Sequence, residues 1–306
     1  MQKKYIGLTA AFLLGISAVA LSTIACANND INLQEAQAEE VFTLDGPGMA
    51  KEFKKEKEVI YWNEQAVYAD ESVIHTGTAM LYYSQAAEKK NKTVCINAGH
   101  GTDGGWEYTT YCHPDHSPKT TGGSTGEGSL KATCISEGTT LYDGTPESEA
   151  TLELALLVRE RLLEAGYNVL MLRESSDVQL DNIARTVLAN QYADCHIALH
   201  YDSTEYNKGA FVINVPDIWE YRNMEPVASH WQEHNRLGEC VIDGFTSVGV
   251  PVFSDGYMGI DLTQTSYSTI PSIDVEVGDR ASDHSKPVLL NLAEGILAGV
   301  NLFFSN

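Results

Sequence analysis

From Thr93 onward, short apolar segments of strand length alternate with longer stretches that have the apolar spacing of amphipathic helices. This alternation limits the folds open to the chain, because strands joined by crossover helices form a mostly parallel sheet with helices on both faces. We therefore expect an α/β fold with a mostly parallel, twisted sheet of about six strands, in one domain spanning 93–306. The predicted strands are 93–97, 168–172, 195–200, 210–215 and 272–277, and the predicted helices are 147–165, 181–191, 227–245 and 287–303.

The first 26 residues have the composition of an export signal. Lys3 and Lys4 precede a long apolar run, and no Asp or Glu occurs before Cys26. Residues 22–26 resemble a bacterial lipobox, in which Cys26 would be acylated and become the mature N-terminus. Cleavage at an Ala-x-Ala site would instead release a soluble protein. We expect an exported protein at the cell surface, either anchored through Cys26 or secreted.

Residues 27–92 lie between this signal and the α/β pattern. They begin as a polar, alanine-rich stretch that ends in a charged run over 51–58, which predicts a tether or a solvated helix. Residues 59–83 alternate apolar and polar side chains and contain several aromatics, which predicts an accessory hairpin. Tyr61 and Trp62 could stack on sugars, although packing is the more common role of such side chains.

The charge balance excludes one class of partner. The chain has 42 Asp and Glu against 20 Lys and Arg. Nucleic acids and anionic lipid surfaces are bound by clustered Lys and Arg, so we expect neither as a partner. Membrane attachment is expected only through a lipid on Cys26.

Four polar residues are predicted to meet at one edge of the sheet. His100, His200 and Glu276 fall at or just after the carboxyl ends of predicted strands, where sites form in parallel sheets. Glu147 opens a helix, capped by Thr145, and can project toward the same edge. Two imidazoles and one carboxylate, with a fourth position left for water, are typical of a catalytic zinc site.

The sequences around these residues resemble a known family. Residues 94–101, Glu147, residues 193–200 and residues 271–278 resemble, in this order, the four motifs of zinc-dependent N-acetylmuramoyl-L-alanine amidases (amidase type 3). Arg173 and Arg185 also match positions typical of that family.

The resemblance implies that His100, Glu147 and His200 hold one zinc ion and that Glu276 is the catalytic carboxylate. The substrate would be peptidoglycan, cleaved between N-acetylmuramic acid and the first L-alanine of the stem peptide.

Some residues beside the motifs depart from the family pattern, namely Asn97–Ala98, Tyr201–Asp202 and Asp279–Arg280. They leave open a catalytically weak or inactive surface lipoprotein that keeps the amidase fold and binds wall fragments or a protein partner. A zinc peptidase on a related sheet is a third hypothesis, although the order of the motifs favours the amidase.

Other histidines are expected to be structural. His230 and His234 are one helical turn apart and lack a carboxylate motif. His196 shares a strand face with His200 but lies about 13 Å deeper along the strand. The run 112–116 contains Cys and His, yet no second ligand pair follows at the spacing of a zinc finger.

Cysteine pairing is predicted from the context of export. The segment 101–145 is long for a connection, so we expect it beside the site, closed by a Cys112–Cys134 disulfide. Cys95 and Cys195 are either close together or buried free thiols, and Cys240 would remain unpaired.

Overall fold

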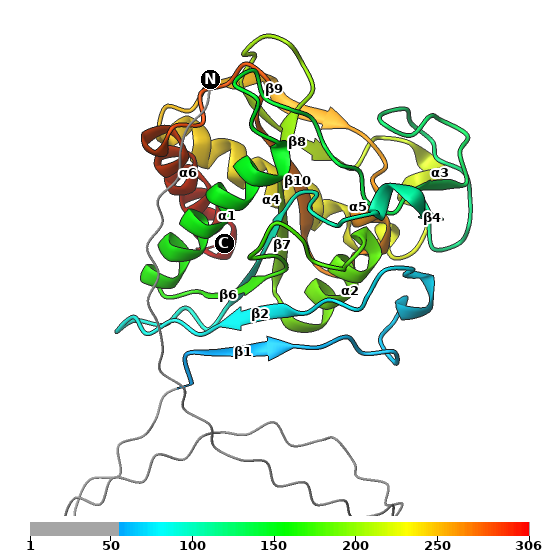
Figure 1. Ribbon diagram of the computed structural model, residues 1–306, viewed down its shortest axis with the longest axis horizontal. Coiled ribbons are helices and arrows are strands. Elements are labelled where there is room, and N and C mark those ends of the chain that lie inside the picture. Colours follow the sequence, from blue (N-terminus) through cyan, green and yellow to red (C-terminus); the bar gives the residue numbers. More distant parts are fainter. Residues whose placement is uncertain (1–54, 306) are drawn as a thin grey trace, which may run out of the picture. The chain divides into compact units, whose positions relative to one another are not determined.

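The computed structural model describes residues 55–305. The predicted export signal, the lipid anchor and most of the predicted tether lie outside the described residues. Within 55–305 the main sheet has eight strands in the order β1-β2-β6-β3-β7-β10-β8-β9 (Figure 1). The strands are β1 (Lys57–Ile60), β2 (Ala79–Tyr82), β3 (Thr93–Ala98), β6 (Asn168–Met171), β7 (Cys195–Asp202), β8 (Ala210–Asn214), β9 (Val252–Gly259) and β10 (Ser272–Asp279).

The centre of the sheet is parallel, which confirms the predicted fold class. β6, β3, β7 and β10 run in the same direction, while β2 and β8 pair antiparallel on either side of them. The carboxyl ends of four neighbouring strands therefore meet at one edge. Strand β9, which pairs with β8, was not predicted, because most of its residues are exposed or half-buried and give little apolar signal.

Helices cover both faces of the sheet (Figure 1). One face carries α1, α4 and α6 over the larger apolar core, and the other carries α2 and α5. A short α3 precedes α4. The bounds are α1 (Glu147–Glu164), α2 (Asn182–Tyr192), α3 (Trp219–Arg222), α4 (Val227–Ser247), α5 (Thr263–Tyr267) and α6 (Lys286–Ser305).

Helix α6 is the one helix in 55–305 that is long and apolar enough to cross a membrane, with a mean hydropathy of 1.6. Its packing is that of a core helix, since it lies against both α4 and α1. Gly244 of α4 faces Gly295 and Gly299 of α6 so closely that an added Cβ would lie 2.2 Å from the Gly295 carbonyl oxygen. The apolar composition of α6 is thus explained by close helix packing inside the domain.

Residues 57–82 extend the main sheet. β1 and β2 form an antiparallel pair, and β2 pairs with β6 through Leu81 and Leu170. Trp62 is half-buried and stacks on His75 at 4.8 Å, whereas the Tyr61 side chain is 66% exposed. Trp62 therefore has a packing role in this structure.

The long segment after β3 contains a small hairpin of its own, formed by β4 (Thr109–Tyr111) and β5 (Lys131–Thr133). The predicted Cys112–Cys134 disulfide is wrong: both thiols are buried and free. Cys112 N–H donates to Leu130 at one end of the hairpin, and Cys134 N–H donates to Tyr108 at the other. The two residues are about 13 Å apart along the ladder, far beyond the Cα separation that a disulfide spans.

A buried carboxylate closes this segment instead. Asp261, which follows β9, accepts a hydrogen bond from Lys119 Nζ at 2.7 Å and from the backbone and side chain of Thr120. Thr121 donates to the same carboxylate, and His113 Nε2 lies 3.2 Å from it. We call these five residues the Asp261 cluster. It fixes the middle of the long segment to the rest of the domain.

The alternatives for Cys95 and Cys195 are resolved by the register of β3 and β7. Val94 pairs with Cys195, and Cys95 pairs with His196. The two cysteines are thus one residue out of register, and their side chains enter cores on opposite faces of the sheet. Both are free and buried, as is Cys240.

Candidate active site

The first part of the site is the turn that follows β3. His100 has φ of +61°, an uncommon conformation for a residue with a side chain. Gly99 has no room for one, because a Cβ there would lie 2.4 Å from the His200 ring. The tight turn therefore brings the His100 and His200 imidazoles together at the carboxyl edge of the sheet.

Two buried arginines hold this turn by its carbonyl groups. Arg173 donates to Gly99 O at 2.9 Å, and Arg185 donates to Ala98 O at 3.0 Å and to His100 O at 2.7 Å. Burial lowers the pKa of Arg173 to about 10 and that of Arg185 to about 9. Both remain cationic at neutral pH, so the turn is fixed by charge-assisted hydrogen bonds.

Glu147 is the first residue of α1, as predicted, although the helix begins differently. Pro146, and not Thr145, occupies the N-cap position, and no side chain caps the helix. The Glu147 carboxylate is buried and accepts from Thr139 N at 2.7 Å on Oε2 and from Tyr201 N at 3.0 Å on Oε1. Its orientation is thus set from two sides.

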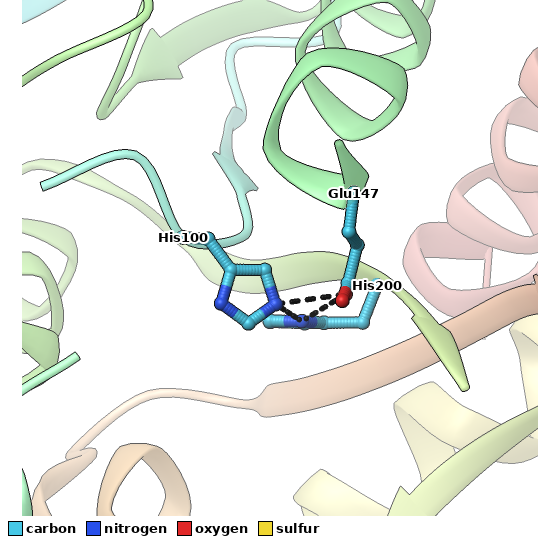
Figure 2. A group of neighbouring side chains, drawn as sticks. All are labelled: His100, Glu147 and His200. Carbon is cyan, nitrogen blue, oxygen red and sulfur yellow. Dashed lines mark hydrogen bonds and ion pairs between the residues drawn. The ribbon is translucent and has the colours of Figure 1, made fainter. Parts of the chain in front are cut away.

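The structure brings together the three residues predicted to hold a metal (Figure 2). Glu147 Oε1 lies 2.8 Å from His100 Nε2 and 3.0 Å from His200 Nδ1, and the two ring nitrogens are 3.0 Å apart. The two rings meet edge to face. Within residues 55–305 no second group of His, Cys, Asp or Glu has donor atoms gathered in this way.

Glu276, the predicted catalytic carboxylate, lies next to this group. It is the register partner of His200 across β10 and β7, so both side chains project from the same face of the sheet. Its Oε2 is buried and has no hydrogen-bond partner in the described part of the chain. Burial, together with the nearby Asp274 carboxylate, raises the pKa of Glu276 well above its usual range.

The charges within the group support one another. Burial opposes ionisation of Glu147, but hydrogen bonds from His100 and His200 outweigh it and hold its pKa well below the usual value. For His200, burial disfavours the charged ring, yet the Asp274 and Glu147 carboxylates raise its pKa to about 10. These shifts show a compact, strongly coupled set of titratable groups, as functional sites often contain.

The segment 134–140 adds contacts that sequence reasoning missed. His100 Nδ1 lies 2.8 Å from the Ser136 carbonyl oxygen, and Thr139 donates its N–H to Glu147. Gly138 lies against His100 and Glu147, since a Cβ there would come within 2.8 Å of atoms of both side chains. Thr139 acts here through its backbone N–H. Ser136 acts through its carbonyl oxygen, and its hydroxyl group also lies 3.2 Å from the same His100 nitrogen. Backbone groups are present in every residue type, so they gave no signal in the sequence.

Asp274 was also missed. It lies on β10 two residues before Glu276, and its Oδ2 is 3.6 Å from His200 Nε2. The alternation of the strand places Asp274 on the same face as Glu276, and this signal was available from the sequence.

Four of the six residues that depart from the family pattern have side-chain partners in the structure, whereas the Tyr201 hydroxyl group is buried without a hydrogen-bond partner in the described residues. Asn97 Oδ1 accepts from Arg185 at 2.9 Å, and Asp279 Oδ2 accepts from Lys208 N at 2.7 Å. Asp202 pairs with Lys208 Nζ at 2.5 Å, and Arg280 donates to Thr140 O at 2.9 Å. Each of these four therefore takes part in holding a loop at the edge of the site.

The rival histidines have structural surroundings. His234 Nδ1 accepts from Ser272 N at 2.9 Å, and His230 Nδ1 lies 2.8 Å from Pro226 O. His196 is fully buried beneath the site, and burial lowers its pKa to about 3, so it is neutral. His113 belongs to the Asp261 cluster.

Comparison with known families identifies the chain. A family model described as N-acetylmuramoyl-L-alanine amidase matches residues 94–289. The chain belongs to this family. The match begins within β3 and ends in α6, so it contains all four predicted site residues. The enzyme class predicted from the sequence is confirmed.

Solved structures of amidases share the fold. The N-acetylmuramyl-L-alanine amidase Ami1 from Mycobacterium smegmatis superimposes with a TM-score of 0.59 and 18% identity, covering 70% of this chain and 97% of that one. Ami1 from Mycobacterium abscessus gives 0.56 and 19%, covering 70% and 98%. The amidase AmiC2 of Nostoc punctiforme gives 0.50 and 16%, covering 72% and 100%. No curated protein matches the chain by sequence.

Proposed function

We propose that this chain hydrolyses the amide bond between N-acetylmuramic acid and L-alanine in peptidoglycan, with one zinc ion held by His100, Glu147 and His200. Membership of the amidase family supports the bond and the substrate. The observation that carries the proposal is the convergence of three inward-facing donor atoms, at 2.8–3.0 Å from one another, beside the carboxylate of Glu276.

The donor set fits zinc. Two imidazole nitrogens and one carboxylate oxygen, with a fourth position open, are the protein ligands of many catalytic zinc sites. Ligand atoms about 2.0–2.2 Å from a tetrahedral ion lie roughly 3.3–3.6 Å apart, so the three atoms, which are 2.8–3.0 Å apart, need to separate by about 0.3–0.8 Å. The outer nitrogen of His100 faces a carbonyl oxygen, which leaves the inner nitrogen as the ligand atom.

Each residue then has a defined part in the reaction. When bound, zinc would supply Lewis acidity toward the scissile carbonyl group and lower the pKa of a bound water molecule to about 7. Glu276 would accept a proton from the attacking water and deliver it to the departing amine. Its unpartnered Oε2 is the oxygen that would carry the proton.

The substrate also fits the location expected from the sequence. Peptidoglycan lies outside the cytoplasmic membrane, so the enzyme needs export, for which residues 1–26 have the expected composition. We propose a protein at the cell surface, either anchored through Cys26 or secreted to the cell wall.

Metal removal tests the proposal. The purified protein is expected to contain one zinc ion per chain, to lose hydrolysis of muropeptides on dialysis against a chelator, and to recover it when zinc is returned. His200→Gln should abolish stoichiometric zinc binding. The matched control is His196→Gln, on the same strand and face but below the site, which should retain zinc. Full zinc content in His200→Gln, or equal loss in both variants, would contradict the ligand assignment.

A further inference from the structure

Asp274 is a carboxylate in a place where the protein fold gains little from one. It lies on the central strand β10, opposite Ala198 of β7, and its side chain is 16% exposed. Its Oδ1 is buried without a hydrogen-bond partner in the described residues, and Glu276 projects from the same face two residues later. A buried carboxylate oxygen that lacks a partner, near a second acid, reduces stability.

The other oxygen of Asp274 faces the proposed metal ligand His200. Asp274 Oδ2 lies 3.6 Å from Nε2, which is the ring nitrogen on the outer side, while Nδ1 faces His100 and Glu147. This is an ion-pair contact, ~0.4 Å longer than the upper limit of an N–H···O hydrogen bond.

The outward-facing atoms of the other two proposed ligands already have partners. The outer nitrogen of His100 lies 2.8 Å from Ser136 O, and Oε2 of Glu147 accepts from Thr139 N. For the outer nitrogen of His200, the contact within reach is the Asp274 carboxylate. In metal sites a ligating histidine donates its second N–H to a carboxylate or carbonyl group, which fixes the tautomer and the ring orientation.

We propose that Asp274 is a positioning residue for His200. Its carboxylate accepts a hydrogen bond from the Nε2–H group of His200, which fixes the tautomer in which the Nδ1 lone pair faces the zinc ion. The inference rests on the proposed zinc site. It adds to that site a residue that acts through His200 and touches neither metal nor substrate. It also explains why a carboxylate occupies a position where it has no structural partner.

The test compares two substitutions with a matched control. Asp274→Leu removes the acceptor, and Asp274→Asn keeps an acceptor oxygen but loses the charge. The control is Asp202→Asn, which also removes a negative charge near Glu276. The Asp202 carboxylate is paired with Lys208 and not with His200. For each protein, zinc affinity is measured by competition with a chromophoric chelator, and Tm is measured on the zinc-free form.

We expect Asp274→Leu to lower zinc affinity by about 10- to 100-fold and Asp274→Asn to lower it less. The Tm of zinc-free Asp274→Leu should stay close to that of wild type, because the substitution removes a buried oxygen without a partner together with a single 3.6 Å ion-pair contact to His200. Asp202→Asn should bind zinc as wild type does. A merely structural role for Asp274 would instead lower Tm in the zinc-free form.

Two results would overturn the inference while leaving the zinc site intact: wild-type affinity in Asp274→Leu, or an equal loss of affinity in Asp202→Asn. If the wild-type protein binds no zinc at all, the proposed function is overturned and this inference with it. The affinity measurement on wild type reveals that outcome before any variant is compared.

Discussion

Replacing Glu276 with glutamine should reduce amide hydrolysis by about 10²- to 10⁴-fold, the usual contribution of general acid–base catalysis, while zinc content stays at one per chain. Glutamine has nearly the same shape but cannot take up the proton of the attacking water. Glu276 is the register partner of His200, so it lies beside the proposed zinc site. Its Oε2 accepts no hydrogen bond from the described residues, so replacing that oxygen breaks no hydrogen bond within the protein.

The measurement is kcat on purified muropeptides, with metal content determined on the same samples. Glu149→Gln is the matched control, since Glu149 is exposed on the first turn of α1, two residues from Glu147. The control should keep wild-type kcat. Near-normal turnover in Glu276→Gln, or loss of its zinc, would show that Glu276 has a different role.

The second large effect concerns stability. Asp261→Ala should lower the free energy of unfolding by about 3–5 kcal/mol at pH 7, the range found when one partner of a buried ion pair is removed. Asp261 is fully buried, and the Lys119 ammonium that it pairs with is itself only 7% exposed. The variant removes the carboxylate that balances this charge, so that Lys119 keeps only the backbone carbonyl oxygen of residue 261 as an acceptor at this position, and it leaves the Thr120 N–H without its carboxylate acceptor.

Acid should weaken the same cluster. Burial opposes ionisation of Asp261, but the adjacent His113 ring and hydrogen bonds from Lys119 and Thr121 outweigh it and hold its pKa well below the unfolded value of about 3.9. A depressed folded pKa means that this stabilisation is complete above about pH 4 and is lost as the pH falls further. Wild type should therefore lose stability below pH 4 more steeply than Asp261→Asn.

Urea unfolding at pH 7 and pH 3 measures both effects. Asp217→Ala is the control, because the Asp217 side chain is 90% exposed and its pair with Arg222 should contribute at most about 1 kcal/mol. If Asp261→Ala unfolds within 1 kcal/mol of wild type at pH 7, the Asp261 cluster does not hold the long segment.

The sequence predicted those parts of the fold that have a strong apolar signal. The strands β3, β6, β7 and β8 were found because each contains a short, mostly apolar run, and β10 was found although its apolar residues alternate with Asp274 and Glu276. The largely exposed β9 and the three-residue strands β4 and β5 were not. The Cys112–Cys134 disulfide failed for a related reason: nearness in a loop does not reveal the hairpin register that sets the distance between two cysteines.

The same distinction holds in the site. His100, Glu147, His200 and Glu276 could be predicted because strand ends and a helix start bring specific side chains to one edge. The backbone groups of the 134–140 segment could not, since a carbonyl or N–H group is present in every residue type.

Product analysis tests directly whether this chain cleaves the bond between N-acetylmuramic acid and L-alanine. Purified peptidoglycan is digested with the zinc-loaded protein, and the fragments are examined by mass spectrometry and by labelling of new amino groups and reducing ends. We expect the wild-type protein to release stem peptides that begin with a free L-alanine amine and to leave glycan strands with no new reducing ends. We expect Glu276→Gln to release no such peptides. Protein that binds zinc one to one yet releases no stem peptide, or release that persists in Glu276→Gln, would contradict it.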